Sequence, residues 1–153
     1  MKKNQTITGT LLYYDVENSN GRIYTKECAE DIVKQFNEGI HNQMPMMGQI
    51  GYPEGDEFRG RLENVSHRIT EIHLNPAKKA IVGTFEILET PQGKKLWEMI
   101  DNDPEKFKET YCLRSRGTGN VNENKEVVDF NIISFDVVSR DTDAFKQYEN
   151  NGN

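Results

Sequence analysis

Histidine is the side chain best suited to proton transfer near neutral pH, and the sequence contains three histidines. His41 lies in a polar segment that is typical of a loop, and His73 lies near the end of an expected strand. His67 alternates with Val65 and Ile69, and a histidine on such a strand face is more often a half-buried structural residue than a base. No two histidines have the i, i+4 spacing that presents two metal ligands on one helix face. The histidines taken alone therefore predict neither a metal site nor a proton-transfer centre.

Three other patterns have the residue types of binding sites but lack the spacing. Cys28 and Cys112 are far apart, which predicts two reduced, partly buried thiols. The acidic segment 54–57 lacks the ligand pattern of a calcium loop and reads as a solvated surface. The segment 117–119, Gly-Thr-Gly, precedes an expected strand, whereas a phosphate-binding glycine loop leads into a helix. We therefore predict no bound metal and no cofactor.

Composition limits the classes of function further. The chain has 153 residues, a net charge of −6, 35% hydrophobic residues and 29% charged residues. The negative charge argues against general attraction to nucleic acid, and we predict no specific nucleic-acid binding. No segment reaches the roughly 18 apolar residues that a membrane-spanning helix needs, so we predict no membrane partner. The first residues lack an apolar signal region, which predicts synthesis in the cytoplasm.

Hydrophobic periodicity predicts one α+β domain over residues 1–140, dominated by antiparallel strands, and a polar tail or arm over residues 141–153. Thr25, Thr90 and Asp103 are expected to begin helices, the last two because proline follows at the first helical position. The expected strands are 6–14, 44–50, 65–74, 80–88, 111–116 and 126–138.

Two of these strands carry further information. In the strand 65–74, simple alternation places His67 and Glu71 on one face and Ile72 on the other. This strand and 80–88 are expected to form a hairpin around a turn at 75–78. The strand 126–138 is apolar on both faces, so we expect it to be central, to carry a bulge or to contact a second chain.

Several short segments, read in order, resemble the T-even type of phage prohead protease, which acts in procapsid maturation. They are Asn18–Tyr24, Gly48–Pro53, Val65–Ile69, Glu89–Lys94, Arg114–Gly117 and Ile133–Val138. Each segment is short, but the ordered set is far more specific than any one of them. The resemblance implies a small antiparallel β-barrel or sheet flanked by two or three helices. That fold is shared with the herpesvirus assemblins and is related to the tube proteins of contractile phage tails.

The resemblance also locates the positions where catalysis would occur. The matching family segments read roughly Gly-Glu-Leu-x-His-Pro and Ser-Ser-Arg-Gly-x-Gly, with His as general base and the first Ser as nucleophile. Here Tyr52 stands at the position of the His and Arg114 at that of the first Ser. Tyrosine has a pKa of about 10 and is a poor base at neutral pH, and a guanidinium can neither attack a carbonyl nor accept a proton. The resemblance therefore implies a member with no catalytic residues.

The protease activity could be retained if Ser115 acted as the nucleophile and His67 as the base. Ser115 is one residue beyond the matched position, and a one-residue shift along a strand turns the side chain to the opposite face. Arg114 and Arg116 flank Ser115 and are expected to share a face. These arginines could bind an oxyanion or acidic peptide in a protease, pair with acidic residues of a neighbouring subunit, or form a solvated basic edge.

Three functions follow from the resemblance. The first is a catalytically inactive structural protein of a tailed-phage virion, assembled in the host cytoplasm, in a head–tail connector, a tail ring or tube, or the capsid. Its expected partners are portal, connector, tail or capsid proteins, and we expect a homo-oligomer or ring. The second is an active prohead maturation serine protease that cleaves scaffold and capsid precursors. The third is a module that regulates an active protease paralogue.

Overall fold

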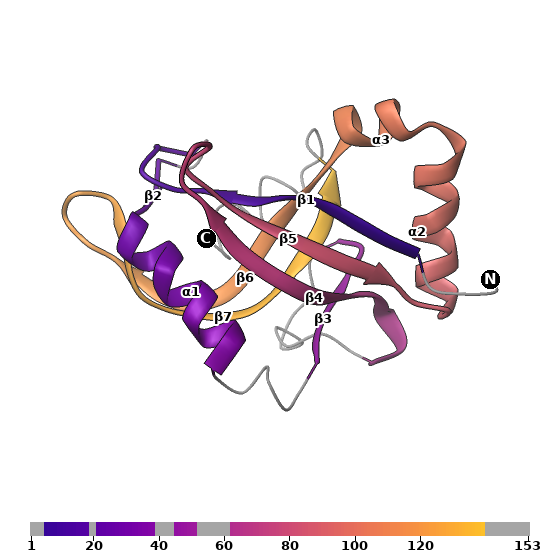
Figure 1. Ribbon diagram of the computed structural model, residues 1–153, viewed down its shortest axis with the longest axis horizontal. Helices are drawn as coiled ribbons and strands as arrows, with labels where there is room; N and C mark the ends of the chain where they lie inside the picture. The colour runs from indigo at the N-terminus through magenta and orange to yellow at the C-terminus, as the bar shows by residue number, and fades with distance from the viewer. Residues whose placement is uncertain (1–4, 19–20, 39–44, 52–61, 140–153) are drawn as a thin grey trace.

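The computed structural model describes residues 5–18, 21–38, 45–51 and 62–139, which form two β-sheets and three α-helices (Figure 1). The predictions for His41, for Tyr52, for the acidic segment 54–57 and for the tail 141–153 lie outside these residues. Within the described ranges, no helix is long and apolar enough to cross a membrane.

The larger sheet has four antiparallel strands in the order β1-β5-β4-β3. Its strands are β1 (Gln5–Tyr13), β3 (Met46–Gln49), β4 (Val65–Asn75) and β5 (Ala80–Ile87). A 3-10 turn, Leu62–Asn64, leads into β4. The expected hairpin is confirmed, because β4 pairs with β5 from His67–Ile87 to Asn75–Ala80.

The smaller sheet has three strands in the order β2-β7-β6. They are β2 (Ile23–Tyr24), β6 (Tyr111–Val121) and β7 (Glu126–Ser139). β6 and β7 are antiparallel, but β2 runs parallel to β7, so this sheet is mixed rather than wholly antiparallel. The strand that is apolar on both faces is central, which is one of the three expected possibilities, since β7 lies between β2 and β6.

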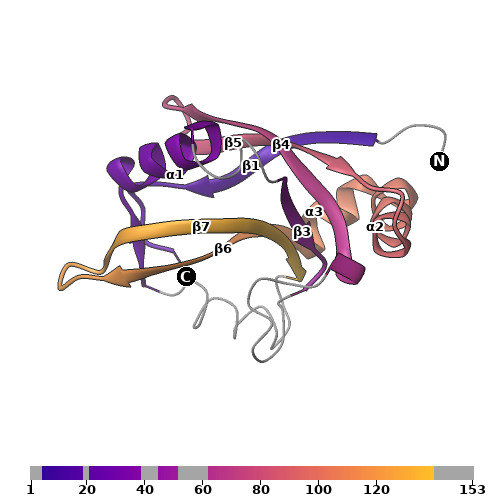
Figure 2. The ribbon, with the colours of Figure 1, turned by 90° about the horizontal axis from the view of Figure 1, so that it is seen from below.

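The two sheets form two layers, with β1, β4 and β5 in one and β6 and β7 in the other (Figure 2). They meet where the chain leaves β3, because Ile50 forms a parallel bridge with Val137 and the Gly51 amide donates to the Val137 carbonyl at 2.7 Å. At the other side, β1 and β6 are both sheet edges and do not pair in the described part of the chain. The architecture is α+β with two open sheets, not a closed barrel.

The three helices begin where the sequence predicts. In α1 (Lys26–Glu38), the Thr25 hydroxyl accepts a hydrogen bond from the Cys28 amide at 3.1 Å. In α2 (Pro91–Asn102), the Thr90 hydroxyl accepts from the Gly93 amide at 2.9 Å. In α3 (Pro104–Thr110), the Asp103 carboxylate accepts from an amide of the first turn. These capping bonds satisfy amides that have no partner within the helix.

Gly93 explains why α2 can begin against the larger sheet. A Cβ at this position would lie 1.8 Å from the Leu88 carbonyl oxygen and 3.0 Å from that of Ser66. The Thr90 hydroxyl also donates to the Val65 carbonyl, so the first turn is tied directly to β4. Glycine at the fourth position of the Thr-Pro-x-Gly segment is therefore a packing requirement.

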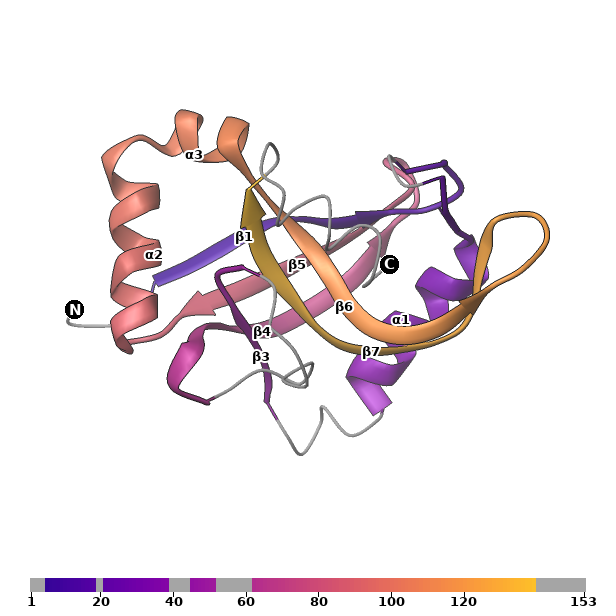
Figure 3. The same cartoon turned by 180° about the vertical axis from the view of Figure 1, so that it is seen from behind.

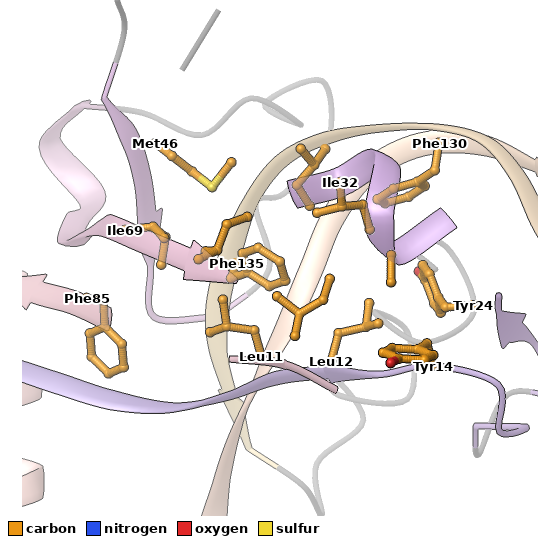
Figure 4. Close-up of a cluster of buried hydrophobic side chains, with 14 of the residues drawn as sticks. Leu11, Leu12, Tyr14, Tyr24, Ile32, Met46, Ile69, Phe85, Phe130 and Phe135 are labelled. Atoms are coloured by element: carbon orange, nitrogen blue, oxygen red, sulfur yellow. The ribbon is translucent and has the colours of Figure 1, made fainter. Parts of the chain in front are cut away.

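The core lies between the sheets and under α1. Figure 4 shows Ile32 of α1 near Phe130 of β7 and Tyr24 of β2, and Phe135 in the centre of the cluster. Ile32 and Phe135 have no exposed surface, and the rings of Tyr24 and Phe130 meet edge to face with centroids 5.6 Å apart. Helix α1 therefore closes one end of the two-layer arrangement.

Two expectations about strands are wrong in detail. A register irregularity between Ile69 and Glu71 interrupts the alternation of β4, so Ile72 is buried while Glu71 is exposed. A bulge adds one residue to one strand and thereby exchanges the faces beyond it. The segment 117–119 does not end the strand, because β6 continues through it to Val121 with two register shifts against β7.

Candidate functional site

The two segments that resemble the family's catalytic segments lie on either side of β7. The segment 48–51 forms the end of β3 and the bridge to β7, and Arg114 to Gly117 lie on β6 (Figure 3). Arg114 is opposite Asp136 in the ladder between β6 and β7. Tyr52 follows immediately after the described residue Gly51. The fold thus brings the two segments to one region, centred on β7.

A buried ion pair lies in this region. Arg116 Nε is 2.7 Å from one carboxylate oxygen of Asp136, and a terminal nitrogen of the guanidinium is 3.1 Å from the other. Both side chains are at most 1% exposed. The Gln49 amide of β3 also donates to Asp136, at 3.1 Å. Burial raises the pKa of Asp136, and the opposing effects come from Arg116 and the Gln49 amide. The pair therefore fastens β3, β6 and β7 together.

The position of Arg116 rules out two of the sequence-based readings for that residue. It is not part of a solvated basic edge, because it is 1% exposed, and its acidic partner comes from the same chain rather than from a neighbouring subunit. A partner within the same chain was not predicted for Arg116. The signal was present, because Arg116 and Asp136 occupy adjacent antiparallel strands in two of the segments that carry the resemblance.

His67 lies on β4 with no exposed surface. Its Nε2 is 2.8 Å from the Phe135 carbonyl oxygen, which can only accept, so Nε2 carries the proton and donates. Its Nδ1 is 2.8 Å from the Ser66 hydroxyl, which therefore donates to it. The ring also meets Phe85 edge to face. Both nitrogens are thus used, the Nε2 contact joins the two sheets, and the side chain is more deeply buried than the sequence predicts.

The pKa of His67 is that of a neutral structural residue. Burial lowers the pKa of His67 from 6.5 to about 4, the hydrogen bond to Phe135 opposes that shift, and the positive charge of Arg116 adds to it. A histidine with this pKa is neutral at physiological pH. A general base works best when its pKa lies near the working pH, so this one is poorly matched to that task.

Ser115 faces the core rather than the Arg116 side of β6. Its Oγ is 3.3 Å from the Tyr24 hydroxyl, and the residue is 3% exposed. Burial raises the pKa of Tyr24 above its ordinary value, and the hydrogen bond with Ser115 opposes this shift only in part. Tyr24 is therefore a protonated phenol and not a base for the serine. The structure brings Ser115 to Tyr24, a residue that sequence reasoning did not connect with it.

Two glycines of these segments are also required for packing. A Cβ on Gly48 would lie 2.3 Å from both His67 Nε2 and the Phe135 carbonyl oxygen. A Cβ on Gly117 would lie 2.3 Å from the Asn131 carbonyl oxygen of β7. Both distances are far below normal contact. The glycines that carry the resemblance therefore allow β3, β4 and β6 to approach β7 closely.

A groove lies beside this region, between the edge of β1 and a wall formed by α2, α3 and the start of β6. Its volume is about 1010 Å³. Ser115 and Arg114 contribute to its lining, while Trp97, Ile100 and Phe107 contribute apolar surface from the helices. Figure 1 shows β1 along the front of the molecule and α3 beyond it.

Among the described residues, no group of three or more His, Cys, Asp or Glu side chains is placed to hold a metal ion. Both cysteines are free thiols, and Cys28 is buried in α1 while Cys112 is partly exposed in β6.

Comparison with known proteins gives a match among the solved structures. No protein-family model and no curated protein matches the sequence. Among solved structures, the capsid assembly protease gp21 of bacteriophage T4 is similar, with a TM-score of 0.72 and 22% sequence identity. The match covers 87% of this chain and 80% of that one. The chain therefore has the fold of a phage capsid assembly protease, as the order of its short segments predicted.

Proposed function

We propose that this chain is a catalytically inactive relative of the prohead proteases that serves as a structural protein of a tailed-phage virion. The fold and the likeness to a phage capsid assembly protease support the phage context. The inactive role is supported by the way in which the chain uses the residues that remain in the two catalytic segments. Its place in the particle would be a connector, a tail ring or tube, or the capsid, with other virion proteins as neighbours.

One observation carries the proposal: the candidate nucleophile and the candidate base are both buried and both bonded to other groups. Ser115 is hydrogen-bonded to Tyr24, and the two nitrogens of His67 are hydrogen-bonded to Ser66 and to the Phe135 carbonyl. A serine hydroxyl needs a base that can take its proton as it attacks. With Nε2 protonated and Nδ1 accepting from Ser66, His67 has no free lone pair to offer.

The same contacts explain why the segments would persist without catalysis. Gly48 and Gly117 allow close approach to β7, and the Arg116–Asp136 pair fastens three strands. Removing one partner of a buried ion pair leaves an uncompensated charge, which destabilises a fold by about 3–5 kcal/mol. Selection for the shape alone would therefore retain these residues while the nucleophile position became Arg114.

The competing function is an active maturation protease, and one observation favours it. Ser115 is among the residues that line the groove, where a substrate would bind. In that case Ser115 would need a local rearrangement to become exposed and to reach a base. Both functions are compatible with this fold, so a measurement of activity is needed to distinguish them.

The test combines incorporation with processing in the phage that encodes the chain. We expect mass spectrometry to find the protein in purified virions, and we expect Ser115→Ala to leave both its incorporation and the processing of head proteins unchanged. Ser134→Ala is a matched control, because Ser134 is also a fully buried serine and its hydroxyl has no hydrogen-bond partner. Loss of head-protein cleavage in Ser115→Ala but not in Ser134→Ala would establish the protease function instead. Absence of the protein from virions would contradict the structural role.

A further inference from the structure

The edge of β7 that faces away from β6 is only partly covered by strands. On the β6 side, the ladder runs from Val127 to Ser139. On the other side, β2 pairs with β7 only as far as Val127, and the next bridge joins Ile50 to Val137. Among the described residues, no strand pairs with the stretch between these two points. Backbone groups left open on such an edge form a template for another strand.

This stretch of β7 has the composition of a segment that assembles with copies of itself. Residues 130–135 read Phe-Asn-Ile-Ile-Ser-Phe, with no charged residue, proline or glycine. Six-residue segments with high β-propensity and no charge stack into ordered aggregates when their edges are exposed. A folded protein that contains this segment in a strand must therefore protect its edge.

The side chain of Gln35, in α1, lies on this edge. Its Nε2 donates to the Phe130 carbonyl oxygen at 2.6 Å, and its Oε1 accepts from the Ile132 amide at 3.0 Å. In a parallel ladder, a residue donates to the carbonyl before the residue opposite it and accepts from the amide after that residue. The carboxamide of Gln35 therefore makes the two hydrogen bonds that a parallel strand would make opposite Asn131.

The neighbouring contacts on this edge follow the same direction. Strand β2 and the bridge from Ile50 are both parallel to β7, so the carboxamide replaces one residue of an interrupted parallel neighbour. Further along, the Phe135 carbonyl accepts from His67 Nε2 of β4. Side chains of α1 and β4 thus bond to backbone groups of β7 where no strand of the described ranges covers them.

The orientation of the Gln35 carboxamide is fixed by its own helix. The Asp31 carboxylate, one turn earlier in α1, accepts a second hydrogen bond from Nε2 at 2.8 Å. The Phe130 carbonyl can only accept and the Ile132 amide can only donate, so a reversed carboxamide would lose both bonds to β7. Helix α1 packs on the same part of β7, where Figure 4 shows Ile32 near Phe130.

We propose that Gln35 is a cap that prevents the segment 130–135 of β7 from pairing with other copies of this chain. The carboxamide satisfies the backbone groups of the segment, but a side chain offers no further strand edge to which another chain could be added. Loss of the carboxamide opens this edge while the apolar contacts of α1 remain. This role is independent of the proposed function in the virion.

The test compares the wild type, Gln35→Met and two controls, all as the full chain. Methionine has a similar length, but it cannot donate to the Phe130 carbonyl and is a poor acceptor for the Ile132 amide. Lys34→Met places the same residue on the exposed side of α1, and Gly93→Ala destabilises the fold at α2. At equal folded fractions, set by temperature, we expect Gln35→Met to form assemblies that bind thioflavin T. The wild type and both controls should stay monomeric in sedimentation velocity.

Hydrogen exchange of individual amides supplies a readout that does not depend on assembly. The Ile132 amide should be protected in the wild type and should exchange about tenfold faster in Gln35→Met, because it loses its acceptor. An unprotected Ile132 amide in the wild type would overturn the proposal without any variant. A folded Gln35→Met that stays monomeric would also overturn it. So would equal assembly of Gln35→Met and Gly93→Ala at equal folded fractions, since general unfolding would then explain the assembly.

Discussion

Acidification should destabilise this protein through the buried residue His67. Its pKa is lowered by burial from 6.5 to about 4, so the unfolded chain binds a proton more readily than the folded one in that range. Each pKa unit corresponds to about 1.36 kcal/mol, and the difference of 2.5 units gives about 3 kcal/mol. This amount is a large part of the stability of a small domain, which is typically about 5–15 kcal/mol.

The direction of the pH effect on stability and the pH range in which it occurs follow from the same difference in the pKa of His67. The folded state holds His67 neutral, so the stabilisation is complete above pH 6.5 and is lost progressively as the pH falls toward about 4. Carboxylates also begin to titrate at the lower end of this range, so the free energy of unfolding of the wild type alone cannot be assigned to one group. The comparison must therefore be made with a variant that lacks the titrating ring.

The assay is urea unfolding of the wild type and of His67→Gln across this pH range. Glutamine keeps an N–H donor for the Phe135 carbonyl but does not titrate, so the variant should be less stable at neutral pH and should lose much less stability on acidification. His73→Gln is the matched control, because the His73 side chain is 55% exposed. Parallel pH profiles for wild type and His67→Gln would refute the reasoning. So would an NMR titration that places the pKa of His67 near 6.5, as expected for an accessible catalytic base.

Two further predictions concern stability and are measured by urea or thermal unfolding. Arg116→Met should destabilise the fold by about 3–5 kcal/mol, because the buried carboxyl group of Asp136 is left without its partner. The double variant with Asp136→Leu should recover much of that loss, and a double variant as unstable as the sum of the two single changes would contradict this account of the pair. Gly93→Ala should destabilise by about 2 kcal/mol or more, because its Cβ would overlap the Leu88 carbonyl. Gly9→Ala should change the stability of the monomer by less than about 1 kcal/mol, and equal effects at the two glycines would show that close packing does not explain Gly93.

The parts of the fold that the sequence predicts are those encoded by local patterns. The helix starts at Thr25, Thr90 and Asp103 are such cases, since capping depends on a few consecutive residues. The hairpin of β4 and β5 and the central position of β7 follow from alternation and from apolar residues on both faces. The face on which Ser115 lies also agrees with simple strand geometry.

Features that depend on the relation between distant strands were not predicted. The bulge near Thr70 and the continuation of β6 through Gly117 arise from pairing, which no local pattern fixes. The contact of Ser115 with Tyr24 joins segments that are far apart in the sequence. The pair of Arg116 with Asp136 joins two adjacent strands. The complete burial of His67 likewise depends on the second sheet. Local alternation shows which residues share a face, but not what covers that face.

We propose that the remaining serine and histidine are structural residues. A fluorophosphonate reacts with activated serines, so the native protein can be treated with one and any adduct located by mass spectrometry. We predict no adduct on Ser115, because this serine is buried against Tyr24 and His67 has no nitrogen free to act as its base. A stoichiometric adduct on Ser115 in folded protein, abolished in Ser115→Ala, would contradict the account and identify an active protease.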